Sequence, residues 1–86
     1  APKDVQARRL RGLASARGKH WQQALDELQP LGLAATDASV AEAMLSSLLG
    51  LNRPKEAAQL YASLTREVAQ APAVAGLGRR ATATKP

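Results

Sequence analysis

Apolar residues recur at intervals of three and four along most of the chain, the spacing that gathers them on one face of an α-helix. This pattern predicts helices over residues 4–17 and 20–31, a third that begins at Asp37 or Ser39, and a fourth over 54–70. Alternation with a period of two never persists, and β-branched residues are scarce. We therefore expect an all-α fold.

Several residues are suited to begin these helices. Asp4 can cap the first helix. Ser39 and Glu42 have the spacing of a capping box, which satisfies free backbone N–H groups at a helix start. Asn52 is a good cap residue, and Pro54 is tolerated in a first helical turn because its missing N–H would have no partner there.

The apolar faces predict which helix forms the core. The third helix carries the widest stripe, so we expect it to lie at the centre of the fold. Trp21 and Tyr61, the two aromatic residues, fall on the stripes of the second and fourth helices, which favours a core position over a stacking platform. The predicted stripe of the first helix consists of Ala7, Leu10, Leu13 and Ala14, and that of the third of Val40, Ala41, Met44, Leu45, Leu48 and Leu49.

The pattern weakens after Pro72. Residues 1–72 are expected to form one helical domain, and residues 73–86 the start of a short capping helix followed by a flexible basic tail. We expect the last ~6 residues to be mobile, as chain ends without packing usually are.

The chain repeats itself at 33–34 residues, a period typical of helical arrays. The second helices of the two pairs align best at a spacing of 33 residues. This spacing matches Ala24, Leu28 and Leu31 with Ala57, Tyr61 and Leu64. The first helices align best at the longer period, with Ala7, Leu10 and Ala14 against Ala41, Met44 and Leu48. One extra residue in the first inter-helix turn would reconcile the two offsets.

On these residues the chain resembles the tetratricopeptide repeat family over roughly residues 4–72. The turn at 51–54, the small Ala57 after Lys55-Glu56, the bulky Tyr61, then Leu64 and Pro72 are similar to that family's second helix and closing proline. Arg11 departs from the pattern, because a Leu is favoured there. The resemblance implies two antiparallel helical hairpins that bind other proteins.

The resemblance also implies an inner groove that binds a peptide or helix of a partner protein. Arg8 would be its anchor, because Arg grips carboxylates in a bidentate manner. The alternative is that these positions are merely exposed faces of a structural hairpin. The implied lining residues are Arg8, Gly12, Ser15, Ser39, Glu42, Ser46 and Leu49. Because about three such repeats are usual for independent stability, we expect association with a partner, with itself as a homo-oligomer, or with further repeats of a larger chain.

The net charge of +5 is unevenly distributed. A basic patch in the first twenty residues comprises Arg8, Arg9, Arg11, Arg17 and Lys19, whereas residues 21–50 carry acidic groups without Lys or Arg. A basic first helix could contact phosphates, so a small nucleic-acid-binding protein is the alternative function. The acidic middle block and the absence of a recognition motif make it the less favoured one.

Catalytic chemistry has little to build on. Cysteine is absent, and the one histidine, His20, falls in a predicted turn without neighbouring acids, so neither a zinc site nor a catalytic triad is expected. No phosphate-binding loop, cofactor site or membrane span is predicted. We expect a non-enzymatic, soluble protein of the cytoplasm or periplasm that acts as an adaptor, scaffold or assembly chaperone, or supplies the terminal repeats of a larger scaffold.

Overall fold

The computed structural model describes residues 2–83 and contains no strand among them, which confirms the all-α prediction. The bounds of the first three helices are close to those that the hydrophobic pattern predicts, whereas the C-terminal part departs from it. The elements are α1 (Pro2–Arg17), α2 (Trp21–Leu28), the 3₁₀ turn η1 (Gln29–Leu31), α3 (Ala38–Gly50), α4 (Pro54–Ser63), α5 (Arg66–Gln70) and α6 (Pro72–Ala83).

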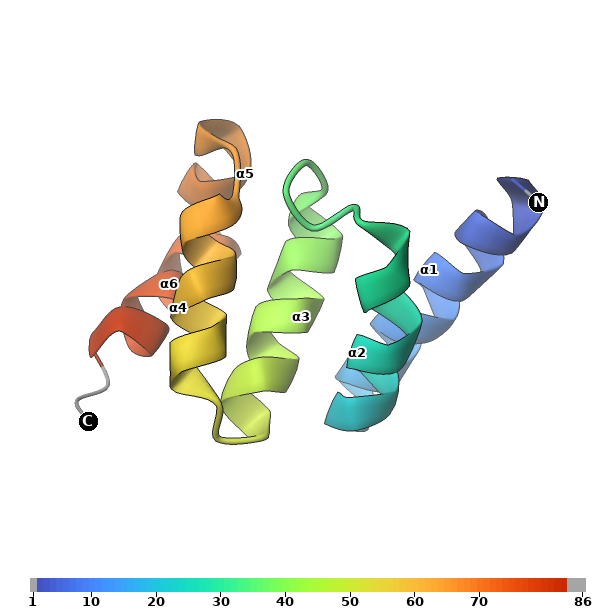
Figure 1. Ribbon diagram of the computed structural model, residues 1–86, viewed down its shortest axis with the longest axis horizontal. Coiled ribbons are helices and arrows are strands. Elements are labelled where there is room, and N and C mark those ends of the chain that lie inside the picture. Colours follow the sequence, from blue (N-terminus) through green and yellow to red (C-terminus); the bar gives the residue numbers. More distant parts are fainter. Residues whose placement is uncertain (1, 84–86) are drawn as a thin grey trace.

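The helices follow one another along the long axis of a molecule with extents of 40 × 26 × 18 Å (Figure 1). The helices α1 and α2 form one hairpin, and α3 and α4 form a second. Central helix α3 contacts α1, α2, α4 and α6. On the far side, α6 packs against α3, α4 and α5, so that α1 and α6 lie at opposite ends of the array.

Central helix α3 supplies more of the buried apolar residues than any other element, as the width of its stripe predicts. Leu45 and Val40 are fully buried there, and Leu28 of α2 and Val74 of α6 reach the same core from either side. The two small residues Ala24 and Ala57 are also completely buried. The buried apolar set is Ala24, Leu25, Leu28, Ala34, Val40, Ala41, Ala43, Met44, Leu45, Leu48, Ala57, Val68, Val74 and Ala81.

The turns inside the two hairpins are copies of one another at the shorter of the two periods. Lys19 and Asn52 occupy the same place in each and share the left-handed conformation, with φ of 63° and 62°. In both turns the following residue donates its N–H to an earlier carbonyl over 2.8 Å, a bond that satisfies the end of a helix. The bonds join His20 to Ser15 and Arg53 to Leu48. Asn52 therefore ends the turn, and Arg53 takes the cap position of α4.

Burial shows that the first helices also repeat at the shorter period, so the alignment at the longer one was wrong. Gly12 and Ser15 are buried in α1, as Leu45 and Leu48 are in α3. Leu10 is 62% exposed, and Ala7 and Ala14 are exposed beside it. Each step along a helix turns it by about 100°, so an alignment shifted by a single position pairs the exposed outer side of α1 with the buried face of α3.

The predicted fourth helix over 54–70 is two helices. Leu64 is extended, with a ψ of 152°, and Thr65 begins α5 by accepting the N–H of Val68 at 3.3 Å. The N–H of Thr65 donates to the carbonyl of Ala35 in the loop between the hairpins, at 3.0 Å. A hydroxyl cap and a tertiary hydrogen bond thus compete with continued helix at this point.

The helix starts differ in part from the predicted ones. Asp37 caps α3, because its carboxylate accepts the N–H groups of Ser39 at 3.1 Å and Val40 at 3.3 Å. Ser39 lies within the first turn, so the capping box predicted with Glu42 does not form. Helix α1 begins at Pro2, which places Asp4 in its first turn instead of before it.

The C-terminal helix is longer than the short cap predicted. Val74 and Ala81 of α6 are buried, and Gly78 between them lies so close to the ring of Tyr61 that a Cβ there would overlap it. The helix continues through Ala83, into the segment for which the pattern predicts mobility. Residues 84–86, the rest of that predicted tail, lie outside the described residues.

Candidate binding groove

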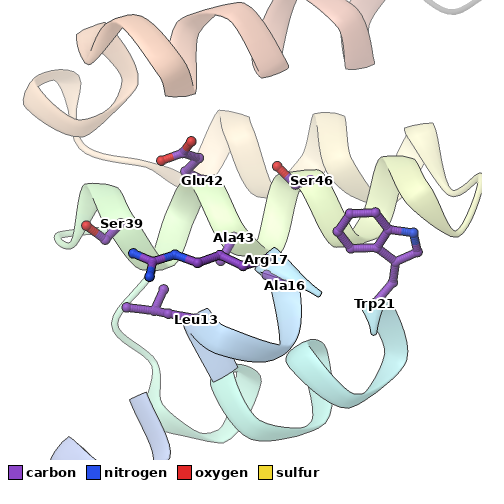
Figure 2. Close-up of a pocket in the computed structure, with 8 residues that line it drawn as sticks. All are labelled: Leu13, Ala16, Arg17, Trp21, Ser39, Glu42, Ala43 and Ser46. Atoms are coloured by element: carbon purple, nitrogen blue, oxygen red, sulfur yellow. The ribbon is translucent and has the colours of Figure 1, made fainter. Parts of the chain in front are cut away.

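A pocket of about 270 Å³ opens between α1 and α3, the first helices of the two hairpins. Figure 2 shows that Trp21 stands at one end of it and Ser39 at the other, with the remaining lining residues between them. We call this pocket the groove. Its lining consists of Leu13, Ala16, Arg17, Trp21, Ser39, Glu42, Ala43 and Ser46.

The floor of the groove is apolar and built from small side chains. Ala16 and Ala43 come from facing helices and leave space between them, and Leu13 adds a larger apolar surface. The indole of Trp21 packs over Gly50, where any Cβ would overlap the ring. Trp21 is only partly buried, so an aromatic face stays open beside the floor. Its predicted core position is therefore correct only in part.

Charged and hydroxyl groups border this floor. Arg17 belongs to α1, and Glu42 lies across from it on α3 with Ser39 and Ser46 (Figure 2). Arg17 and Glu42 are both exposed. In the part of the chain that the structure describes, neither makes an ion pair. The groove thus offers one positive and one negative charge to a partner.

An ion pair ties the two walls of the groove together near its Ser39 end. The Nε of Arg9 donates to Asp37 Oδ2 at 2.8 Å, and its Nη2 donates to Oδ1 at 3.3 Å. The hydrogen bond from Arg9, with the N–H groups of Val40 and Ser39, lowers the pKa of Asp37 below its usual value. Because Asp37 caps α3, the pair fixes α1 against the start of α3.

The predicted basic patch is divided by pairing within the chain. Arg9 binds Asp37, and Arg11 donates to Glu27 of α2 at 3.1 Å. Glu27 also accepts the hydroxyl of Ser15 at 3.4 Å. The other three cations of the patch, Arg8, Arg17 and Lys19, are exposed. The acidic middle block therefore neutralises part of the first helix.

Three of the seven predicted groove residues line the groove, namely Ser39, Glu42 and Ser46. Gly12 and Ser15 instead face α2, where Gly12 lies against Leu28 and Ser15 bonds to Glu27. Arg8 is exposed on the same side of α1 as these two, because residues 8, 12 and 15 share one helical face. Leu49 is half-buried and packs against the core.

The three misplaced residues of α1 share one cause. At the longer period, Glu42, Ser46 and Leu49 correspond to Arg8, Gly12 and Ser15, whereas the observed shorter period pairs them with Arg9, Leu13 and Ala16. Leu13 and Ala16 do line the groove. The spacing of the second helices, from Ala24 to Ala57, was the signal that could have found them, had it been applied to the whole repeat.

A second pocket, of about 340 Å³, lies on another side of α3, between α2 and α4. Its floor is formed by Leu25, Met44, Leu48 and Leu60, and its rim is polar. No pattern in the sequence indicates this pocket. The polar lining residues are Gln22, Gln29, Arg53, Glu56 and Gln59.

Reactive groups in the described residues do not converge on either pocket. His20 is exposed in the turn before α2, and the buried hydroxyl of Ser47 donates to the carbonyl of Ala43 at 2.7 Å. Among residues 2–83, no three His, Asp or Glu side chains are grouped so that they could hold a metal ion. No helix in the same range is both long and apolar enough to span a membrane.

Comparison with known proteins found no match to a protein-family model, to a curated protein or to a solved structure.

Proposed function

We propose that this chain is a non-catalytic protein-interaction module that binds a peptide or helix of a partner protein in the groove between α1 and α3. The observation that carries the proposal is the groove itself. It has an apolar floor of small side chains, a partly exposed Trp21, and two charged residues without an ion pair, Arg17 and Glu42. Adaptor, scaffold and assembly chaperone are the roles that such a module would serve.

The groove suits side chains of a protein better than an enclosed small molecule. Small-molecule sites usually occupy roughly 300–1,000 Å³ and bury most of their ligand, whereas this pocket of about 270 Å³ is an open trough between two helices. Tryptophan is among the residues that contribute most to protein interfaces, because its large surface loses water on binding. An apolar partner side chain could rest on Ala16 and Ala43 with one edge against Trp21.

The two charges would orient the partner. Rim charges contribute more to specificity than to affinity, because they reject partners of the wrong polarity. A segment that places a carboxylate near Arg17 and a basic group near Glu42 would satisfy both. The common period of turns, cores and second helices supports the further proposal that the module is a repeat of the tetratricopeptide kind.

The nucleic-acid alternative has weaker support. Phosphate binding depends on the number of free cations that a protein brings to the backbone. Two of the five residues in the basic patch, Arg9 and Arg11, are engaged with Asp37 and Glu27. We therefore expect only weak, salt-sensitive and sequence-independent binding to RNA or DNA.

The proposal is tested by selecting displayed random peptides, long enough to form several helical turns, on the purified chain. Binding is then measured through the fluorescence of Trp21, the one tryptophan. Ser46→Arg fills the groove from α3. Ser63→Arg is the matched control, because it makes the same change at an exposed position at the end of α4.

The proposal predicts peptides that bind the parent chain and Ser63→Arg alike, with at least about tenfold weaker binding to Ser46→Arg, a loss of about 1.4 kcal/mol. Selected peptides that bind both variants equally would place the site elsewhere. A nucleic acid that binds more tightly than any selected peptide at physiological salt would favour the alternative function.

A further inference from the structure

The outer face of α1 carries an apolar stripe that is exposed in the described structure. It consists of Ala7, Leu10 and Ala14, spaced three and four apart so that they share one side of the helix. All three are exposed, and Leu10 is exposed by 62%. Contiguous exposed apolar surface is a feature of interaction sites, whereas single exposed apolar residues are common, so the repeat has to show what this stripe does.

The second hairpin shows what covers such a face. The residues one repeat later are Val40, Ala43 and Ser47, with exposures of 0%, 7% and 0%. On the edges of this face, Ala43 lines the groove with α1, and Met44 lines the second pocket with α2. The face between them therefore points at the first hairpin. In α3, this position of the repeat is buried by a preceding helical hairpin.

The opposite end of the array is already covered. Helix α6 packs against both helices of the second hairpin through Val74, Gly78 and Ala81, which are buried. The molecule thus has one end closed by its own helix and one end, α1, with an open apolar face. A head-to-tail stack of copies would require α6 to leave its place.

We propose that the outer face of α1 is a docking surface for a further helical hairpin, which packs on α1 as α1 and α2 pack on α3. The occupant presents Ala and Leu side chains to Leu10. Asp4 stands one repeat before Asp37, so an acid recurs at this position of the repeat, within the first turn of α1 and at the cap of α3. The further hairpin would thus repeat, on α1, the interface that already exists between the two hairpins.

The test lengthens the full chain by one copy of its own hairpin. In the extended protein, residues 1–37 are followed directly by residues 5–86, so every position recurs at the period of the two hairpins and Asp37 of the added copy precedes Val5 as it precedes Ala38. Leu10→Gln is then placed in the internal copy of α1 and, separately, in the parent chain. Glu42→Gln in both proteins is the control, because Glu42 lies in the groove and away from the stripe.

We expect the extended protein to unfold in one transition, at a higher Tm than the parent. Leu10→Gln should lower the Tm by at least about 4 °C more in the extended protein than in the parent, the size expected when an exposed Leu becomes a core residue. Glu42→Gln should have the same small effect in both.

Three results would overturn the proposal. The added hairpin could unfold in a separate transition, or it could stay unstructured while the rest of the protein keeps the Tm of the parent. Each of these outcomes would show that α1 does not bind a further hairpin. Equal effects of Leu10→Gln in the two proteins show that the stripe stays exposed. The parent chain could also form a dimer in sedimentation equilibrium. If Leu10→Gln makes that dimer dissociate, a second copy of the chain covers the stripe. The peptide selection tests the groove, and its result does not depend on any of these three outcomes.

Discussion

Arg9 and Asp37 join the two hairpins through a two-pronged ion pair, with Nε of Arg9 2.8 Å from Oδ2 of Asp37 and Nη2 3.3 Å from Oδ1. The same carboxylate caps α3 by accepting two backbone N–H groups. One side chain therefore both begins the central helix and fixes α1 beside it. The contact therefore joins the two helices that form the groove walls.

This arrangement predicts a pH-dependent stability. The folded-state pKa of Asp37 is lowered, chiefly by the hydrogen bond from Arg9, so the unfolded chain takes up the proton first as pH falls. The stabilisation is fully present above the unfolded value near 3.8 and is lost as pH falls through the lower folded value.

Asp37→Asn should remove that part of the acid dependence while it keeps a cap oxygen, and Asp37→Ala should also lose about 1 kcal/mol of cap energy at neutral pH. Urea unfolding at pH 7 and pH 3 measures both. Asp26→Asn, at an exposed position of α2, is the control and should leave the acid dependence intact. An unchanged pH profile in Asp37→Asn would refute the ion pair.

Substitution by alanine should have opposite effects on stability at two glycines, Gly12 and Gly76. A Cβ at Gly12 would overlap the side chain of Leu28, which is fully buried and has no room to move. Gly12→Ala should therefore destabilise the fold by about 1–3 kcal/mol. Gly76 lies in α6 with nothing within 4 Å of its Cβ position, so Gly76→Ala should stabilise by about 0.5–1 kcal/mol through helix propensity. Denaturant unfolding of both variants decides, and the same sign for both would contradict the packing described.

The break between α4 and α5 depends on the hydroxyl of Thr65. Thr65→Ala removes the acceptor for the N–H of Val68 and should cost about 1 kcal/mol in urea unfolding. Thr36→Ala is the matched control, because Thr36 is exposed and its hydroxyl makes no hydrogen bond in the described structure. A cost for Thr36→Ala as large as that for Thr65→Ala would mean that the cap does not hold the break.

The burial of the first and third helices predicts very different costs for one substitution. Leu45 is completely buried at the centre of α3, so Leu45→Ala should cost about 2–5 kcal/mol, a large part of the stability of a domain of this size. Leu10→Ala should change the stability by less than about 0.5 kcal/mol, because the side chain is already exposed. Similar losses of unfolding free energy for the two variants would mean that Leu10 is buried in the core.

The fold class and the central helix could be predicted because α3 has an unbroken pattern, with Val40, Met44 and Leu48 repeating every fourth residue. The face of α1 could not be predicted from apolarity. Its buried side consists of Gly12 and Ser15, whose smallness allows helix contact, while Leu10 remains outside. A period drawn from apolar residues therefore selected the wrong offset.

The groove was predicted in part on the α3 side, where Leu49 packs against the core instead, and was missed on the α1 side for the same reason. Ser39, Glu42 and Ser46 are placed by a helix whose register was clear, whereas Leu13, Ala16 and Arg17 follow the register of α1. The end of α4 was missed because a Thr cap and a long-range bond to Ala35 overrode local helix preference. Tertiary contacts of this kind leave no periodic trace in a sequence.

The measurement that tests the central claim most directly is mapping of backbone amide chemical shifts on the isotope-labelled chain during titration with a selected peptide. We predict that the largest changes fall on Ala16, Ala43 and Trp21, that they saturate, and that they vanish in Ser46→Arg but persist in Ser63→Arg. Changes concentrated on the second pocket between α2 and α4, or spread over the cations of α1 and lost in moderate salt, would contradict a protein-binding groove between α1 and α3.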